Sequence, residues 1–223
     1  MSFWRKVFAI ARKDTLSEAR SREIVASVLV FALLALVIFN FAFDADRETL
    51  QLIAPGILWV TFAFSGVLSL NRAFIMEREG GCMEALLVSP IPREAIYVGK
   101  MLGSFVFMLF VEAVVLLAFS ILFNVNVFSP PLIVTTVLTT IGFVAVGTLF
   151  AAMAVNTKAR EMVLPILFLP IISPVVIAAV RATGAALTGA AWGELVDRLG
   201  IIVAFDMVFI TAAYLTFVYV IEE

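Results

Sequence analysis

The chain has 223 residues, 63% of them hydrophobic and 14% charged, with a formal net charge of −2 and no histidine. Its mean hydropathy of +1.13 excludes a water-soluble domain with a polar exterior. These values predict an integral membrane protein, and we expect no nucleic-acid partner.

Residues 1–23 are predicted to form a cytoplasmic amphipathic helix that lies along the membrane surface. Apolar side chains recur there at helical spacing, at Phe3, Trp4, Val7, Phe8, Ile10 and Ala11. Four charged residues are assigned to the polar side: Arg5, Arg12, Lys13 and Asp14. An ordinary solvated leader is the alternative, but it leaves Trp4 and Phe8 unexplained.

Six apolar segments reach the roughly 20 residues that a helix needs to cross about 30 Å of hydrocarbon. They are Ile24–Phe43, Leu50–Leu70, Met101–Phe123, Leu132–Val155, Met162–Val180 and Leu199–Ile221. Barrel strands would be about ten residues of alternating polarity, so these runs predict helices. The fold class is therefore an all-α integral membrane protein, in which residues 1–223 form a single six-transmembrane-helix bundle.

The distribution of basic residues predicts the orientation, because Lys and Arg are retained on the cytoplasmic side. One side, which holds both termini, would carry Arg5, Lys6, Arg12, Lys13, Arg20, Arg22, Arg72, Arg78, Arg93, Lys100, Lys158 and Arg160. The opposite side would carry only Arg47, Arg181 and Arg198. Both termini are therefore expected in the cytoplasm.

Residues 71–100, between the second and third spans, are predicted to form a cytoplasmic coupling loop. The second span should continue through Asn71–Glu79 and end at Gly80 and Gly81, because two adjacent glycines carry a large backbone entropy cost. Pro90 and Pro92 should stop the element that follows.

A short helix is expected between these glycines and prolines. Met83, Leu86 and Leu87 form a narrow apolar face, and Glu84 lies near the N-terminal end, where a negative charge is favoured. A helix this short is unstable alone in water. Docking into a groove of a cytoplasmic partner is therefore favoured over the alternative, in which the leucines rest on lipid headgroups.

Two acids interrupt the apolar spans, Glu112 in the third and Asp206 in the sixth. Acids within a membrane are candidate functional residues, although a protonated carboxyl that is hydrogen-bonded to a neighbouring helix is the structural alternative.

Span five contains Pro165, Pro170 and Pro174 and should be kinked. Residues 181–198 are expected to form an outer segment before the last span, and residues 124–131 a tight outer turn.

The sequence lacks the imidazole ligands and the phosphate-binding loop that many cofactor and nucleotide sites use, which leaves only weaker thioether, thiolate or phenolate ligands. Cys82 is the sole cysteine, so no intramolecular disulfide can form. Without histidine the chain cannot ligate haem or zinc through imidazole. No phosphate-binding loop precedes Gly99 and Lys100. We therefore assign no catalytic, cofactor-binding or metal-binding residue.

The order PGILWVTFAFSGVLSL, then NRAFIMEREGGCMEALLVSPIPREAIYVGK, resembles protein B of the cytochrome c maturation haem exporter (the CcmB family), within the ABC-2 type exporter superfamily. The resemblance runs from Lys13 to the end of the sixth span and is most specific over residues 55–100. The family's G-x-x-E-x-L-L-x-S-P pattern and the intervening methionine imply an ATPase-coupling segment made of Gly81, Met83, Glu84, Leu86, Leu87, Ser89 and Pro90. Two positions differ from many members, since Gly80 replaces an acidic residue and KMLGSF lacks a histidine.

The resemblance implies a permease subunit, not an enzyme, in a bacterial plasma (inner) membrane. Its implied partners are a separate ABC ATPase subunit that binds ATP, with two copies of each, a haem-handling membrane protein, a small accessory subunit and a haem chaperone. The complex would handle haem and couple ATP hydrolysis to haem export or to release of the haem-loaded chaperone. No strong haem site is expected within this chain.

Two alternatives stay open at the level of sequence. A general ABC-2 exporter permease for lipid, drug or glycan would share the topology and the coupling helix. A membrane transporter or scaffold that is not coupled to ATP would be expected to contain internal repeats and discontinuous helices, and no convincing repeat is present.

Overall fold

The computed structural model describes residues 2–43, 47–79, 88–155 and 160–222, and every regular element within these ranges is an α-helix. The helices are α1 (Phe3–Arg20), α2 (Arg22–Ala42), α3 (Arg47–Glu79), α5 (Arg93–Phe123), α6 (Pro130–Val155), α7 (Arg160–Leu187) and α8 (Trp192–Glu222). All of these except α1 contain a stretch long and apolar enough to cross a membrane. The predicted all-α class and the six spanning helices are confirmed.

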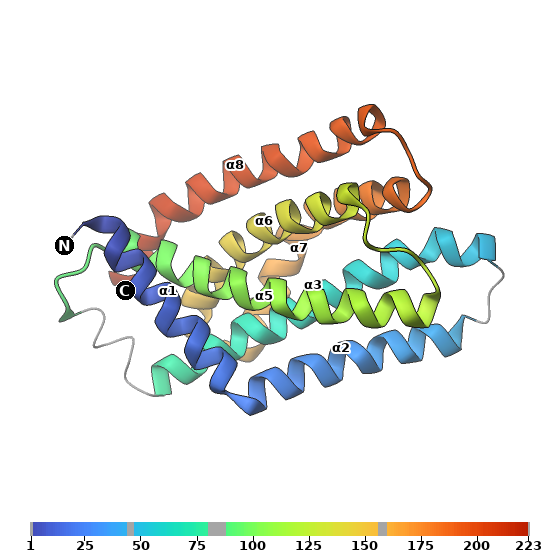
Figure 1. Ribbon diagram of the computed structural model, residues 1–223. Helices are drawn as coiled ribbons and strands as arrows, with labels where there is room; N and C mark the ends of the chain where they lie inside the picture. The colour runs from blue at the N-terminus through green and yellow to red at the C-terminus, as the bar shows by residue number, and fades with distance from the viewer. Residues whose placement is uncertain (1, 44–46, 80–87, 156–159, 223) are drawn as a thin grey trace.

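The six long helices run along a common direction, and α1 crosses the bundle at one end (Figure 1). Both chain termini lie at that end, whereas the α7–α8 connection lies at the opposite end. Helix α6 contacts α3, α5, α7 and α8. The spanning stretches of α3 and α6 are the most enclosed, so the other helices provide most of the surface available to lipid.

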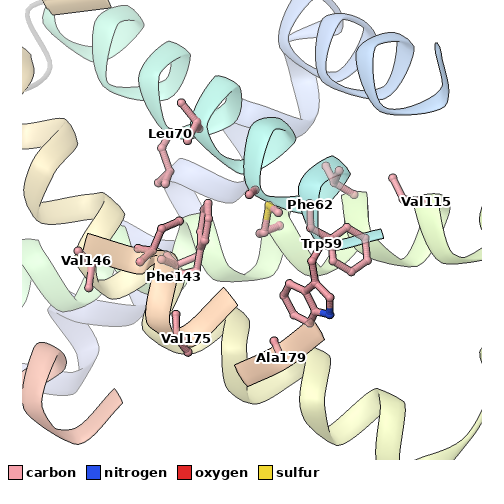
Figure 2. Packing of buried hydrophobic residues seen from close by; sticks show 14 of the residues in the cluster. Trp59, Phe62, Leu70, Val115, Phe143, Val146, Val175 and Ala179 are labelled. Atoms are coloured by element: carbon pink, nitrogen blue, oxygen red, sulfur yellow. The ribbon is translucent and has the colours of Figure 1, made fainter. Parts of the chain in front are cut away.

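Aromatic side chains fill the interior around α3, α6 and α7. Figure 2 shows Trp59 and Phe62 of α3 on the same side of the cluster, with Phe143 of α6 and Ala179 of α7 nearby. The indole Nε1 of Trp59 donates a hydrogen bond of 2.9 Å to Thr183 Oγ1, which joins α3 to α7. Lipid is as apolar as these side chains, so close packing and such hydrogen bonds hold the helices together.

The boundary of one helix differs informatively from the predicted spans. Helix α3 continues to Glu79, as expected, but α5 begins at Arg93 rather than at Met101. Lys100 is charged, so the sequence assigns it to the predicted loop of residues 71–100. In the structure its side chain is only 3% exposed, because α1 covers it.

The expected outer segment of residues 181–198 does not form a separate element, which corrects that prediction. Helix α7 remains a single helix past its three prolines to Leu187, and α8 begins at Trp192. Gly189, with φ of +76°, ends α7, and the amide of Ala190 donates to Ala185 O while that of Gly189 donates to Ala186 O. This paired bonding with a left-handed glycine is the Schellman motif, which closes the turn in a few residues.

Candidate functional site: the coupling surface and the buried acids

The predicted coupling segment is described only at its C-terminal end. Outside the described residues lie Gly81, Met83, Glu84, Leu86 and Leu87. Ser89 and Pro90 follow Val88, whose side chain is 89% exposed, and precede the start of α5. The structure therefore places the end of this segment on the surface, and the coupling roles of all seven residues, Ser89 and Pro90 included, stay predictions.

Helix α1 is joined directly to the end of the coupling segment. The Lys6 ammonium donates a hydrogen bond of 2.7 Å to the Pro90 carbonyl. Between α1 and residues 89–91 lies a hollow of about 750 Å³, and its lining includes Arg5, Lys6 and Lys13. The N-terminal helix and residues 89–91 thus line one basic hollow.

Helix α1 also packs unusually close to the first half of α5, and two glycines make this possible. A methyl group on Gly99 would lie 2.7 Å from Ile10 Cβ, and one on Gly103 would lie 2.9 Å from Asp14 Cβ. Glycines four residues apart let two helix backbones approach closely. The G-x-x-x-G spacing of residues 99–103 is the sequence signal that could have revealed this contact.

A cluster of charged side chains is buried in the α1–α5 contact. Lys100 Nζ lies 3.7 Å from Asp14 Oδ2, and Lys13 Nζ lies 2.8 Å from Asp14 Oδ1. Glu18, one helical turn further along α1, is also buried. The expectation that Asp14 lies on an exposed polar side is wrong, because the face of α1 that meets α5 carries Asp14 and Glu18 as well as Val7 and Ile10.

Glu18 titrates in an unusual range as a result. Burial, assisted by the negative charge of Asp14 and opposed by the positive charge of Lys100, raises the pKa of its carboxyl from 4.5 to about 8. Within the described part of the chain, Glu18 Oε2 accepts no hydrogen bond. At neutral pH the protonated form of Glu18 is therefore favoured, and the carboxyl acts as a neutral group inside the contact.

Glu112, the predicted acid of the third span, lies at the contact between α5 and α6 and is 2% exposed. The Thr140 hydroxyl oxygen lies 2.7 Å from Oε1 and 2.9 Å from Oε2 of Glu112, and 2.8 Å from Thr136 O. A hydroxyl has one proton to donate. A protonated Glu112 that donates to Thr140, which in turn donates to Thr136 O, satisfies this geometry.

The Glu112 carboxyl also borders a small cavity with apolar walls, which include Trp59, Phe62 and Phe143. Figure 2 shows these three aromatic side chains converging in the interior. The cavity has a volume of about 10 Å³, which is close to the minimum for one water molecule. The site is too small for a transported molecule and suits a structural hydrogen bond.

Asp206, the predicted acid of the sixth span, lies at a different contact, between α8 and α6. Its Oδ1 atom occupies the space that a side chain on Gly142 would fill. This oxygen accepts no hydrogen bond from any side chain or backbone group that the structure describes. Thr140 and Gly142 are two residues apart on α6 and so face in different directions. The structure therefore does not bring Glu112 and Asp206 together.

No group of three or more His, Cys, Asp or Glu side chains within the described ranges is arranged to hold a metal ion.

The fold and these sites define a class of protein: a helical, multi-pass membrane protein with an N-terminal helix packed across the start of an inner span. Comparison with known families is more specific. The model of the family described as CcmB protein matches residues 5–221, and the chain belongs to this family.

Curated relatives agree with this assignment. The chain is 30% identical to Heme exporter protein B of Pseudomonas aeruginosa over 81% of each chain. It is 32% identical to Heme exporter protein B of Rhodobacter capsulatus over 67% of this chain and 69% of the relative. It is also 29% identical to the protein of that name from Paracoccus denitrificans, over 73% and 75% of the two chains.

Proposed function

We propose that this chain is the membrane subunit of an ATP-driven haem exporter complex that acts in cytochrome c maturation. The family match over residues 5–221 carries the proposal, and the names of the curated relatives support haem as the exported molecule. ATP is bound and hydrolysed by a separate ATPase subunit, with two copies of each subunit. A haem-handling membrane protein, a small accessory subunit and a haem chaperone complete the set of partners.

In this proposal the coupling loop transmits the ATPase cycle to the spans. The exposed Val88, the hydrogen bond from Lys6 to Pro90 and the basic hollow beside it support a partner surface at this end of the bundle. A partner can drive a conformational change only if it binds two states of the chain with different affinity. Movement of residues 88–91 is shared with α1, and through α1 with α5. The outcome is haem export or release of the haem-loaded chaperone.

The proposed orientation places both termini and the coupling loop in the cytoplasm of a bacterium. The excess of Lys and Arg at this end supports it. Cys82, the sole native thiol, should react with a membrane-impermeant maleimide only from the cytoplasmic side. In a Cys82→Ser background, Asn126→Cys should react only from the outside. Reaction of both thiols from the same side would rule out this topology.

The combination Glu84→Lys and Leu87→Asp tests the coupling segment. An aspartate buried in an interface without a counter-charge is strongly unfavourable, and the reversed charge at position 84 opposes a basic partner group. We expect loss of co-purification with the ATPase and loss of haem-stained c-type cytochromes at normal membrane levels of the protein.

The matched control is Val196→Asp with Asp197→Lys, which makes the same types of charge change on exposed residues at the opposite end of the bundle. This variant should keep the ATPase bound. Normal ATPase binding and haem staining in the test variant would remove the segment from the mechanism. Normal haem staining after deletion of the whole chain would instead favour a permease for another substrate.

A further inference from the structure

The α7–α8 corner brings together two arginines that the function proposed above does not use. Arg198 Nη1 of α8 donates a hydrogen bond of 3.0 Å to the backbone oxygen of Arg181 on α7. The tight turn at Gly189 folds α8 back along α7 and so sets this pairing. The corner lies at the end of the bundle opposite the chain termini (Figure 1).

A groove runs from this pair of arginines along α7 and α8, away from the corner. It has a volume of about 310 Å³ and is lined by Pro174, Ile177, Ala178, Arg181, Arg198 and Ile201. Arg181 and Pro174 are seven residues apart, so the α7 wall descends about 10 Å below the arginine. The groove is therefore cationic at its outer end and apolar along its length.

The level of the arginines matches the surface of a membrane. The uninterrupted apolar runs of α7 and α8 end at Val180 and start at Leu199, so each arginine is the first charged residue next to its run, and we infer that both lie at the edge of the hydrocarbon. Trp192, at the start of α8, is 50% exposed, as is typical of side chains at the headgroup level. The groove therefore begins among the headgroups and ends among the acyl chains.

The charges of the groove indicate what fills it. Guanidinium groups bind phosphate through two parallel hydrogen bonds, and two of them favour an anionic group. Glu194 lines a second hollow beside the pair and Asp197 precedes Arg198, but neither carboxylate lines the groove, whose charged lining residues are the two arginines. The apolar walls suit a hydrocarbon chain rather than the acidic loop of a soluble protein.

We propose that the groove between α7 and α8 binds one anionic phospholipid of the leaflet opposite the termini. Its phosphate lies between Arg181 and Arg198, and one acyl chain lies along Ile177 and Ile201. The bound lipid lowers the positive charge of the arginine pair and links the ends of α7 and α8.

Native mass spectrometry of the purified full chain in detergent tests this proposal, with phosphatidylglycerol and zwitterionic phosphatidylcholine as probes. We expect one phosphatidylglycerol to bind about tenfold more tightly than phosphatidylcholine, because both headgroups carry the phosphate but only choline adds a positive charge that the two arginines repel. Arg181→Gln with Arg198→Gln should remove the preference. Arg20→Gln with Arg22→Gln, at the other end of the bundle, is the matched control and should retain it.

A second variant separates a lipid site from a site for phosphate alone. Ile177→Trp keeps both arginines but fills the groove, and it should lower phosphatidylglycerol affinity, whereas inorganic phosphate should not displace the lipid from the native chain. The proposal is overturned by unchanged lipid preference in the Arg181 and Arg198 variant, by equal loss in the control, or by displacement with phosphate. It is also overturned if the native chain shows no preference for phosphatidylglycerol, as expected for a groove that an acidic protein covers.

Discussion

Lys100 of α5 and Asp14 of α1 form a buried ion pair, with Nζ 3.7 Å from Oδ2. Both side chains leave water, and their desolvation is offset only while the partners stay together. Helix α1 is thus fixed to the start of a membrane span by charge as well as by packing. A helix that only rested on the membrane surface would not bury an aspartate against a lysine.

Removal of the lysine charge should loosen this contact. Lys100→Met leaves Asp14 buried without its partner in α5, which typically costs about 3–5 kcal/mol. We expect a lower thermal unfolding midpoint in detergent and faster proteolysis within α1. Adding Asp14→Asn to Lys100→Met should recover most of the loss, because the buried charge of Asp14 is then removed as well and Lys13, which loses its partner, is exposed to water.

Lys13 offers the control for this experiment, since it also pairs with Asp14 but has a side chain that is 43% exposed. Lys13→Met should change stability by about 0–1 kcal/mol, as is usual for exposed ion pairs. Equal losses for Lys13→Met and Lys100→Met would contradict a special role for the buried pair.

The raised pKa of Glu18 predicts that the stability of the α1–α5 contact depends on pH. Its pKa of about 8 in the folded chain lies above the value of 4.5 for the unfolded chain, so the folded state retains a proton that the unfolded state loses. The contribution of protonated Glu18 to the stability of the folded chain is fully present below about pH 4.5 and is lost as the pH rises through about 8. Asp14, Lys100 and Lys13 are the charged groups at this contact.

Thermal unfolding of the native chain and of Glu18→Gln between pH 5 and 9 measures this effect. The stability of the native chain relative to Glu18→Gln should fall across this range by a few kcal/mol, on the order of 1.4 kcal/mol per unit of pKa shift. Glu23→Gln, at an exposed acid of α2, should leave the pH dependence as it is. A constant difference between the native chain and Glu18→Gln would show that Glu18 is not buried in solution.

Gly99 should not tolerate a side chain. In Gly99→Ala the added methyl group meets Ile10 at 2.7 Å, and the two helices must separate to accommodate it. We expect a loss of about 1–3 kcal/mol in the free energy of unfolding, as is usual for overpacked contacts. Gly200→Ala provides the comparison, because a methyl group there meets nothing within 4 Å. If both variants unfold at the native temperature, α1 does not pack closely on α5.

Glu112 should be replaceable by glutamine without loss of the fold. The amide of Glu112→Gln can still bond Thr140, whereas Glu112→Ala enlarges the cavity and should cost about 2–5 kcal/mol, the range found for large-to-small core changes. Thermal unfolding in detergent separates the two variants. Loss of c-type cytochromes in Glu112→Gln at normal protein levels would show that an ionisable group, and not only a hydrogen bond, is required.

The spans could be predicted from the sequence because each one is a long apolar run, and helix length and hydropathy follow directly from the thickness of the hydrocarbon. The continuation of α3 to Glu79 was also predictable, whereas Gly80 and Gly81, which are expected to break the helix, lie outside the described residues. The start of α5 was not, because Lys100 is charged and a pattern along the chain does not show that α1 supplies its counter-charge.

The same limit applies to the candidate sites. The sequence identifies Glu112 and Asp206 as unusual because acids are rare in spans, but only the structure shows that they face different helix contacts. Asp14 and Glu18 were missed because acids on a surface helix are ordinary. Their burial depends on two glycines in another helix, Gly99 and Gly103.

The bond between Lys6 and Pro90 joins residues that are 84 positions apart, and this separation has a consequence for synthesis of the chain. The ribosome completes α1 and the first two spans, in α2 and α3, before it makes the segment that holds Pro90 and Lys100. At the usual rate of about 5–20 residues per second, α1 waits several seconds for its partner. During that interval Asp14 and Glu18 have no access to Lys100. The earliest helix of this bundle to be made therefore reaches its final position only after the third span has been inserted.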